Sequence, residues 1–276
     1  MTPTIRMLSL AEVATLVDWA AGEGWNPGRD DAAAFHAADP EGFLGAFIGD
    51  EMVAGIAAVA YGADFGFIGL YICRPDMRGQ GYGKAVWDAG MARLAGRTIG
   101  LDGVPAQQAN YRGMGFADDY RTFRWSGRFD GERPSGPVRP VTPDLLASIA
   151  AFDRLHFPAP RTDFLQRWVA KPHAALVSMD GEVMRGYGVA RACRDGFKVG
   201  PLFADDLGVA ITLLTALASS CNGDIHIDVP GPQERFSRLL EAAGLSQGFE
   251  TARMYRGPAP AIRLGGVYAV TSLELG

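Results

Sequence analysis

The chain has 276 residues, a length typical of about two domains. Hydrophobic residues make up 48% of it and charged residues 21%, which is typical of a globular protein and excludes a disordered one. The net charge is −5 and the basic residues form no run or stripe, which argues against nucleic acid as the main partner because binding a phosphate backbone needs clustered lysine and arginine.

The sequence contains no apolar run near the roughly 20 residues that a membrane-spanning helix needs. Its first residues lack the apolar core of a signal peptide. We therefore expect a cytoplasmic protein without a membrane partner. The three cysteines lie far apart, which favours free thiols, and the four histidines have no paired ligand spacing, so we expect no metal site.

The first part of the chain is predicted to form helices and the outer strands of a sheet. Ser9 and Glu12 have the spacing of a capping box, which predicts that a helix begins there. Gly49 and Asp50 are typical of the turn of a β-hairpin. We predict an edge strand, a helix, a glycine- and proline-rich loop, a short helix and two strands over residues 1–10, 11–21, 23–29, 30–38, 42–49 and 51–61.

The stretch from Phe65 to Leu94 organises the rest of the chain. Apolar and aromatic residues up to Pro75 predict a buried strand, three glycines follow at alternate positions, and apolar residues then recur at helical spacing from Ala85. A glycine turn before a helix leaves backbone N–H groups free to bind phosphate, although the same pattern also serves as a tight connection. The turn does not match the phosphate loop of nucleotide hydrolases, because Ala85 lacks the hydroxyl that this motif requires. It does not match the dinucleotide-binding fingerprint either, because Lys84 stands in place of the third glycine.

A second segment with a recognisable pattern follows a short predicted strand at residues 98–101. It lies on and just after a short helix predicted at residues 107–114, and a closing strand is predicted at residues 123–125. The residues of this pattern are Asn110, Tyr111, Gly115 and Phe116. Strands with a few helices around them favour an α/β fold, here an α+β arrangement with a mixed sheet.

Taken together, these two segments resemble the GNAT superfamily of N-acetyltransferases. Arg78-x-x-Gly81-x-Gly83 is similar to the coenzyme-A-binding motif of that superfamily, and Asn110-Tyr111-x-x-x-Gly115-Phe116 is similar to the segment that follows it there. The loop Glu23-Gly-Trp25-Asn26-Pro27-Gly28 resembles an early loop of a bacterial two-domain branch. The resemblance implies tandem GNAT-like domains, each a mixed sheet flanked by helices, that transfer an acetyl group directly from acetyl-CoA to an amine.

The resemblance also implies roles for single residues. A backbone N–H near Ile72 or Cys73 would polarise the thioester carbonyl, as an oxyanion hole does. Tyr111 would protonate the leaving thiolate, and simple packing of its ring is the alternative. We discount Cys73 as a nucleophile because a thiol within a buried strand is usually inert. The cofactor-binding residues implied in this way are Tyr71, Ile72, Cys73, Arg78, Gly79, Gln80, Gly81, Tyr82, Gly83, Lys84 and Asn110.

Residues 130–140 contain three prolines and two glycines, and we interpret them as a linker between a first domain at residues 1–129 and a second at residues 141–276. The second domain faintly repeats the first. In place of the glycine turn it has Asp205 and Asp206, which would satisfy a helix N-terminus and repel a pyrophosphate. We predict that this degenerate copy does not bind coenzyme A and instead shapes the acceptor site. Residues 267–275 alternate and are expected to add a strand.

The acceptor side is defined by weaker signals. Residues 1–130 carry 11 basic and 16 acidic side chains, and a negative field favours a cationic acceptor such as a small amine. Arg191 and Arg253 would suggest an amino-acid-like acceptor if they face the cleft, because arginine binds carboxylates in bidentate fashion. Trp25 is expected either to line the pocket or to pack beneath its loop. The substrate-binding candidates are Trp25, Asn26, Asp102, Tyr187, Arg191, Asp228 and Arg253. His156 and Tyr255 are further, weak candidates. The sequence does not identify the general base. It is either water or one of the carboxylates Asp30, Asp31, Asp64, Asp102, Asp205, Asp206 and Asp228.

The sequence therefore predicts an N-acetyltransferase that acts on a small amine. One alternative is a non-catalytic acyl-CoA sensor, which would keep the glycine turn but need no acid at Tyr111. The other is a protein or peptide N-acetyltransferase, for which an open groove is expected in place of a closed pocket. The sequence leaves the acceptor and the oligomeric state open.

Overall fold

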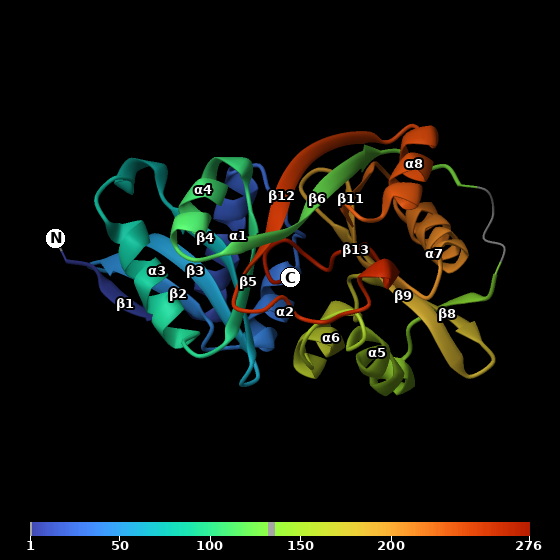
Figure 1. Cartoon of the computed structure of the whole chain (residues 1–276), viewed down its shortest axis with the longest axis horizontal. Helices are drawn as coiled ribbons and strands as arrows, with labels where there is room; N and C mark the ends of the chain where they lie inside the picture. Colours follow the sequence, from blue (N-terminus) through green and yellow to red (C-terminus); the bar gives the residue numbers. More distant parts are fainter. Residues whose placement is uncertain (1, 132–135) are drawn as a thin grey trace.

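We analysed a computed structural model of the protein, which describes residues 2–131 and 136–276. Within these residues thirteen strands form one mixed sheet flanked by helices (Figure 1). The first half consists of β1 (Thr4–Met7), α1 (Leu10–Gly22), α2 (Asp31–Ala38), β2 (Phe43–Ile48), β3 (Glu51–Tyr61), β4 (Phe65–Cys73), α3 (Tyr82–Arg93), β5 (Thr98–Gly103), α4 (Pro105–Gly113) and β6 (Ala117–Gly127). The second half consists of β7 (Val138–Pro140), α5 (Leu146–Asp153), α6 (Thr162–Trp168), β8 (Ala174–Asp180), β9 (Val183–Ala192), β10 (Phe197–Ala204), α7 (Leu207–Ser220), β11 (Ile225–Pro230), α8 (Glu234–Ala242), β12 (Ser246–Arg256) and β13 (Val267–Ala269).

The two halves exchange their last long strands. The order across the sheet is β1-β2-β3-β4-β5-β12-β6-β11-β10-β9-β8-β7, and β13 pairs with β10 outside this path. Thus β12 of the second half lies between β5 and β6, while β6 of the first half pairs with β11. The two exchanged strands run side by side through the centre of the molecule (Figure 1). Because backbone hydrogen bonds at the middle of the sheet come from both halves, neither half completes its sheet alone.

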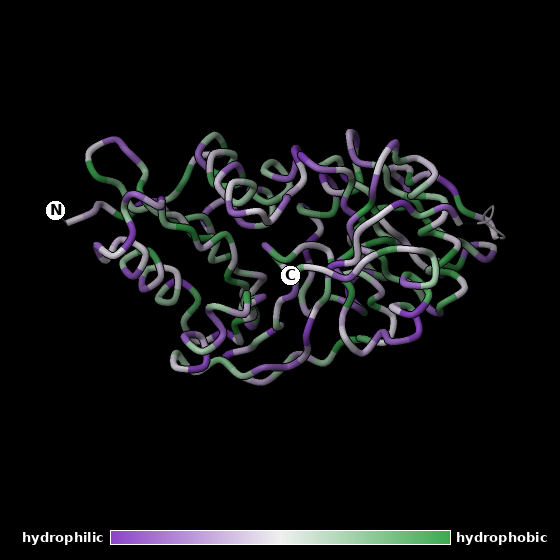
Figure 2. Tube along the Cα trace, turned by 90° about the horizontal axis from the view of Figure 1, so that it is seen from above, coloured by the Kyte–Doolittle hydropathy of each residue, from purple (hydrophilic) through white to green (hydrophobic). Residues whose placement is uncertain are grey.

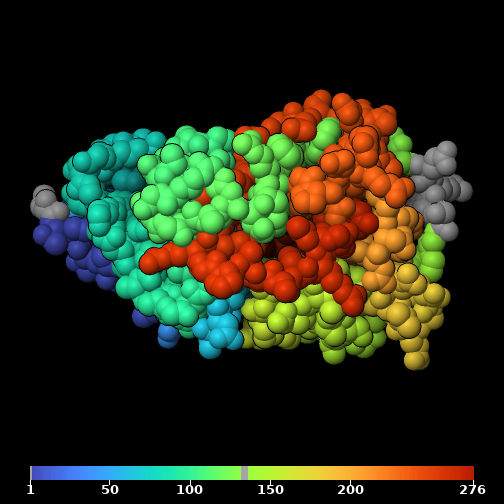
Figure 3. Space-filling model, viewed as in Figure 1, coloured from blue at the N-terminus to red at the C-terminus, as the bar shows by residue number. Residues whose placement is uncertain are grey.

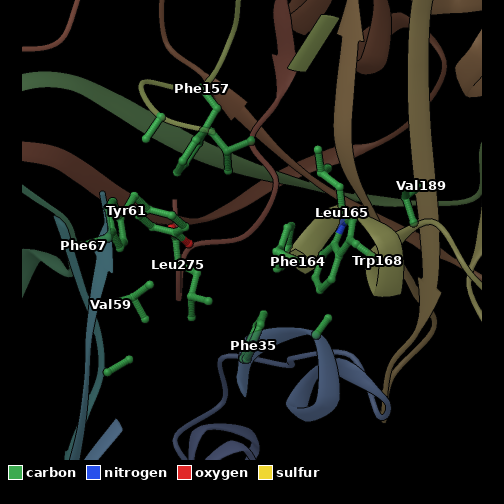
Figure 4. Packing of buried hydrophobic residues seen from close by; sticks show 14 of the residues in the cluster. Phe35, Val59, Tyr61, Phe67, Phe157, Phe164, Leu165, Trp168, Val189 and Leu275 are labelled. Carbon is green, nitrogen blue, oxygen red and sulfur yellow. The ribbon is translucent and has the colours of Figure 1, made fainter. Parts of the chain in front are cut away.

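One hydrophobic core is shared by the two halves. Side chains from the first half, such as Phe35 and Tyr61, point toward Phe157, Trp168 and other residues of the second half (Figure 4). The rings of Tyr61 and Phe157 meet edge to face with 4.9 Å between their centroids. Both rings are at least 97% buried, at exposures of 3% each. We therefore expect the halves to unfold together, since separating them would expose this apolar surface to water.

Helix α1 begins where the sequence predicts it. The backbone N–H of Glu12 donates to the hydroxyl of Ser9, and the N–H of Ser9 donates to the carboxylate of Glu12 at 2.8 Å, which completes the capping box. A hydrogen bond from Arg6 lowers the pKa of Glu12 to about 2. Val13 and Leu16 lie on the buried face of the helix, which positions the loop after it against the sheet.

The structure of residues 136–140 and 267–276 differs in part from the linker and the strand that the sequence predicts there. Residues 132–135 of the linker lie outside the described residues, but Val138–Pro140 forms β7 and pairs with β8. In the C-terminal segment only Val267–Ala269 forms a strand. The chain then turns, because the hydroxyl and the carbonyl of Ser272 accept the N–H groups of two later residues. The final residues, 270–276, which we call the C-terminal tail, therefore reach the middle of the molecule, where Figure 2 marks the C-terminus. The red C-terminal part of the chain also crosses the middle of the surface in Figure 3.

Buried ion pairs join the two halves near the exchanged strands. Arg124 on β6 donates two hydrogen bonds to Asp228 on β11, at 2.7 and 3.0 Å. Arg253 on β12 donates two to Asp102 on β5, at 2.9 and 2.8 Å. In each of these pairs every charge is matched by a bidentate partner, which is the condition under which ionised groups are tolerated inside a protein.

The helices within residues 2–131 and 136–276 include none that is long and apolar enough to cross a lipid bilayer. The three cysteines, Cys73, Cys193 and Cys221, are free thiols, as their separation in the sequence predicts.

Three buried histidines predict a loss of stability in mild acid. Burial lowers the pKa of His156, His173 and His226, so the unfolded chain binds protons more readily than the folded one. Stability from these groups is complete above their unfolded pKa of about 6.5 and is lost as the pH falls toward their folded values. We expect the free energy of unfolding in urea to decrease by about 1–3 kcal/mol between about pH 7.5 and pH 5.5.

The control for this prediction is His173→Gln. The imidazole of His173 is 8% exposed and its Nδ1–H donates to the carbonyl of Trp168 at 2.9 Å, a bond that an amide can replace. The variant should have a shallower dependence of unfolding free energy on pH. An unchanged dependence would show that this histidine is not responsible.

Candidate active site

A pocket opens where two neighbouring parallel strands separate. β4 and β5 pair from Phe65–Thr98 to Ile68–Leu101, and no further pairs follow within this described ladder. At Leu70 the backbone of β4 adopts a positive φ of 46°, and its register with β3 shifts, which marks a bulge. A cavity of about 400 Å³ fills the space beyond this point. The bulge therefore turns part of a buried strand into the wall of a pocket.

Both halves of the protein line this pocket. The first half contributes Glu23, Trp25, Ile68, Gly69, Leu70, Tyr71, Ile72, Cys73, Arg78, Leu101, Asp102, Val104, Gln107 and Tyr111. The second half contributes Phe249, Thr251, Leu273 and Glu274. Most of these side chains are apolar, so the few polar ones determine how a ligand is oriented.

The glycine turn lies beside one end of the pocket. Gly79 and Gly81 have φ values of 77° and 87°, a region that favours glycine, and a Cβ at either position would meet no atom within 4 Å. Gly81 is the N-cap of α3 and offers no side-chain cap to the first turn. The N-terminal N–H groups of α3 are thus free of a side-chain cap, and the open space around the turn suits a phosphate group.

Arg78 connects this turn to the pocket. Its Nε donates to the carbonyl of Cys73 at 3.0 Å, and its guanidinium pairs with Glu23. Lys84 instead points along α3, where it is 77% exposed and pairs with Asp88 at 2.5 Å. Lys84 does not line the pocket, so only the arginine of the two predicted cations is placed at its edge.

The other residues implied for cofactor binding surround the same end. Tyr71 and Cys73 line the pocket with Ile72, while Tyr82 is buried at the start of α3. A Cβ at Gly83 would lie 3.0 Å from the hydroxyl of Tyr71, so this glycine lets the strand approach the helix. The exposed side chains are Gln80, whose amide donates to Asp76 at 3.5 Å, and Asn110, whose amide donates to Gln107 at 2.8 Å.

Tyr111 lies on α4 and faces the pocket. Its ring stacks on Trp87 with 5.5 Å between the centroids, and the ring of Tyr71 packs on the same tryptophan at 5.2 Å. Burial raises the pKa of Tyr111 to about 12. The phenol therefore stays protonated throughout the neutral range and can act as a hydrogen-bond donor toward a group in the pocket.

The predicted acceptor loop is attached to the second half. Trp25 lines the pocket, and its carbonyl accepts from Arg124 at 3.0 Å and from Lys198 at 3.2 Å. Asn26 does not line the pocket. Its side chain is used to hold the loop, by donating to the carbonyl of Asp195 at 2.8 Å and accepting from the N–H of the same residue. The second half therefore positions a loop of the first half over the site.

Four candidates from the second half lie elsewhere. Tyr187 is fully buried and donates to Asp153, Arg191 pairs with Asp31, and the carboxylate of Asp228 is occupied by Arg124. The four candidates absent from the pocket wall are Tyr187, Arg191, Asp228 and Arg253. Because both arginines are paired with carboxylates, they are not free to bind an acceptor carboxylate, and the amino-acid-like acceptor loses the support that the sequence offered.

Of the candidate bases, only Asp102 is among the described residues that line the pocket. Asp102 lines the pocket, but both of its oxygens accept from Arg253. Asp30, Asp31, Asp64, Asp205, Asp206 and Asp228 are absent from the described lining of this pocket. Asp206 is instead the N-cap of α7 and accepts the N–H of Val209 at 3.0 Å, so its side chain caps this helix N-terminus.

Sequence reasoning missed the residues that the second half does supply. Phe249 and Thr251 reach the pocket only because β12 is exchanged into the first half, and Leu273 and Glu274 only because the C-terminal tail turns inward. Glu274 is 3% exposed, and one of its oxygens has no hydrogen-bond partner. A usable signal was present in the sequence, since Glu274 is the sole charged residue among the apolar and small residues 267–275.

Comparison with known proteins identifies the family. Residues 10–117 match the profile of the Acetyltransferase (GNAT) family, and residues 149–269 match that of the Acetyltransferase (GNAT) domain. Over 281 aligned residues the chain is 32% identical to holothin acyltransferase of Pseudoalteromonas sp. (strain SANK 73390), with 100% of this chain and 95% of that protein covered. The chain belongs to the GNAT acetyltransferase family. It is an acyltransferase built as a tandem pair of GNAT domains.

Solved structures agree with this tandem GNAT fold. A candidate acetyltransferase from Pyrococcus horikoshii superimposes with a TM-score of 0.81 at 22% identity and covers 100% of this GNAT chain and 96% of its own. A tandem GNAT protein from the clavulanic acid biosynthesis pathway superimposes with a TM-score of 0.62 at 14% identity, covering 93% of this chain and 99% of its own. At these identities the likeness concerns the fold. The faint repeat in the sequence is thus a repeat of two GNAT domains.

Proposed function

We propose that this GNAT enzyme transfers an acetyl group from acetyl-CoA to the nitrogen of a small amine. The observation that supports this most directly is the pocket at the separation of β4 and β5, which extends from Arg78 to Tyr111 and is bounded by residues of both halves. We assign acetyl-CoA binding to the first domain, residues 1–129, and the shaping of the acceptor side to the second, residues 141–276. GNAT family members use acetyl-CoA, and the uncapped glycine turn fits its phosphates.

The residues of the pocket have complementary roles in this proposal. The backbone N–H groups at the glycine turn would bind the pyrophosphate together with Arg78. A backbone N–H of β4 near Ile72 or Cys73 would stabilise negative charge on the thioester oxygen. Tyr111 would donate a proton to the sulfur as the C–S bond breaks, which its protonated state at neutral pH allows.

The size of the pocket and its lining from both halves favour a small acceptor over a protein. A cavity of about 400 Å³ lined by Trp25, Phe249 and Leu273 among others suits a small molecule, whereas a peptide would need an open groove. The relative's name makes holothin one compound to include in an acceptor screen. The screen should measure thiol release from acetyl-CoA with holothin and a panel of primary amines.

Replacement of Tyr111 by phenylalanine tests the chemical part of this proposal. The ring and its stacking on Trp87 are kept, and only the proton donor is lost. We expect turnover of the best amine to fall by about 100-fold or more, with the affinity for acetyl-CoA, measured calorimetrically, unchanged. Unchanged turnover would exclude the acid role. Acetyl-CoA binding by the wild type without turnover of any amine would favour the sensor alternative.

A further inference from the structure

Glu274 is held at the wall of the pocket by the fold of the C-terminal tail. The backbone of Glu274 crosses β4 at Gly69, where an added Cβ would lie 1.8 Å from the carbonyl oxygen of Glu274. On the other side of the tail, Arg161 donates to the hydroxyl of Thr271 at 2.8 Å and to the carbonyl of Gly276 at 3.3 Å. Arg161 is itself fixed by a bidentate pair with Asp153. The position of Glu274 beside the bulge of β4 is therefore set by backbone packing and a buried ion pair.

Glu274 differs from the other acids of the pocket in its partners. Among the described pocket residues, Glu23 is paired with Arg78 and Asp102 with Arg253. Glu274 is 3% exposed, yet its Oε2 has no hydrogen-bond partner. An unpaired polar atom at such depth costs free energy, which a ligand that donates a hydrogen bond would recover. The arrangement thus calls for a donor in the pocket.

Charged groups on four strands surround this carboxylate. Arg124 on β6, Arg191 on β9 and Lys198 on β10 are close enough to feel the charge of Glu274, as is Asp102 on β5. The cations are already engaged, the two arginines with Asp228 and Asp31 and the lysine with the carbonyl of Trp25. They compensate the negative charge of Glu274 without occupying its oxygens, so the carboxylate remains open to a ligand.

A second unpaired polar atom belongs to another residue of the pocket wall. The hydroxyl oxygen of Thr251 on β12 is buried without a partner, although Thr251 lines the pocket. Around these two polar groups the wall is apolar: Trp25, Ile68, Leu70, Phe249 and Leu273. The described pocket residues therefore combine an apolar chamber with one unpaired carboxylate oxygen and one unpaired hydroxyl, and the guanidinium of Arg78 is tied to Glu23.

We infer that Glu274 is the group that takes the proton from the acceptor nitrogen, and that the acceptor is an amine with an apolar body and no carboxylate. The amine would donate to Glu274, with Thr251 as a neighbouring hydrogen-bond partner, while the apolar body fills the chamber. A second carboxylate would face Glu274 as a like charge with no free cation to pair with it. This inference rests on the proposed function and adds to it the base and the acceptor class.

The proton balance follows from this placement. The protonated amine gives one proton to Glu274, and the freed electron pair of nitrogen forms the bond to the carbonyl carbon of the thioester. The C–S bond breaks, its electron pair leaves with sulfur, and sulfur takes the proton of Tyr111. The second proton of the nitrogen is lost to solvent as the amide forms. Glu274 then releases its proton to solvent and Tyr111 regains one, so the enzyme returns to its starting state.

The test compares Glu274→Gln, Glu274→Asp and the control Glu250→Gln in the full chain. Glu250 is on β12 beside Thr251 but pairs with Arg121 at 3.0 Å outside the pocket. Phenethylamine and related arylalkyl amines serve as acceptors, and phenylalanine and its counterparts are the matched carboxylated probes. We expect Glu274→Gln to lower kcat/KM for the best amine by about 100-fold or more. The kcat/KM of Glu274→Asp should lie between those of the wild type and Glu274→Gln. Glu250→Gln should have the kcat/KM of the wild type.

Each outcome separates this inference from the proposed function. Wild-type kcat/KM in Glu274→Gln, or equal values for the Asp and Gln variants, would overturn the role of Glu274. A preference for carboxylated probes, or turnover of none of the apolar amines by a wild type that binds acetyl-CoA, would overturn the acceptor class. Failure of the wild type to bind acetyl-CoA in calorimetry would overturn the proposed function itself. The affinity for acetyl-CoA in Glu274→Gln should change by less than about twofold, since a general loss of structure would reduce it.

Discussion

Replacing Gly81 with glutamate is expected to weaken the binding of acetyl-CoA by at least about 100-fold, close to 2.7 kcal/mol. Two effects combine. The position has φ of 87°, so any side chain strains the turn, and the empty space beside it would be filled by a carboxylate. That carboxylate would occupy the end of α3 that should hold a pyrophosphate and would repel it. Calorimetric titration of acetyl-CoA measures the change, and one site per chain is expected for the wild type.

The matched control for this variant is Gly96→Glu. Gly96 follows α3, has φ of 83°, and also has no atom within 4 Å of an added Cβ, so the two substitutions share the backbone strain and the added charge. Gly96 lies beyond the C-terminal end of α3, whereas Gly81 is the N-cap at the other end. We expect its variant to bind acetyl-CoA as the wild type does. Equal losses in both variants would mean that strain, and not the phosphate site, explains the effect. Two sites per wild-type chain would show that the second domain also binds the cofactor.

Replacing Asp102 with alanine is expected to lower the free energy of unfolding by about 3–5 kcal/mol. Arg253 would then be left without its carboxylate at 4% exposure, between the rings of Phe67 and Tyr120. The pair joins β5 to the exchanged strand β12, so its loss weakens the contact between the halves. Urea unfolding followed by two probes should show one transition in both proteins, because the sheet and core are shared.

Asp118→Ala provides the comparison on the surface. Asp118 also accepts two hydrogen bonds from an arginine, Arg112, but the side chains are 44% and 49% exposed. We expect this variant to lose less than about 1 kcal/mol. The double variant Asp102→Ala/Arg253→Met should recover part of the lost stability, since it removes the uncompensated charge. If Asp102→Ala is no more destabilising than Asp118→Ala, the buried pair does not hold the halves together.

Local features were accessible from the sequence. The capping box at Ser9 and Glu12 and the glycine turn at Gly79 and Gly81 depend on residues that are neighbours along the chain. Their geometry is therefore set by backbone sterics and short-range hydrogen bonds. The GNAT family followed from the motifs at residues 78–83 and 110–116, and the tandem architecture from the resemblance and the faint repeat of the second half. The comparisons confirm both, and the mixed sheet confirms the α/β class.

Features that depend on long-range packing were not accessible. No local pattern names the partner of β12, and its exchange with β6 is decided by which strands it meets in the folded sheet. The same holds for buried charges. The sequence made Arg191 and Arg253 candidates for binding an acceptor carboxylate if they faced the cleft. In the fold they pair with Asp31 and Asp102 instead, because an ion is tolerated in the interior only next to a partner.

The sequence by itself determined the family, the repeat and the place of the glycine turn, because short motifs and their order along the chain encode them. Only the tertiary structure decided which residues meet in the acceptor pocket. Glu274 reaches it because the C-terminal tail folds back across Gly69, and Thr251 because β12 is inserted between the strands of the other half. Such contacts join residues about 150 or more positions apart, and no local pattern specifies them.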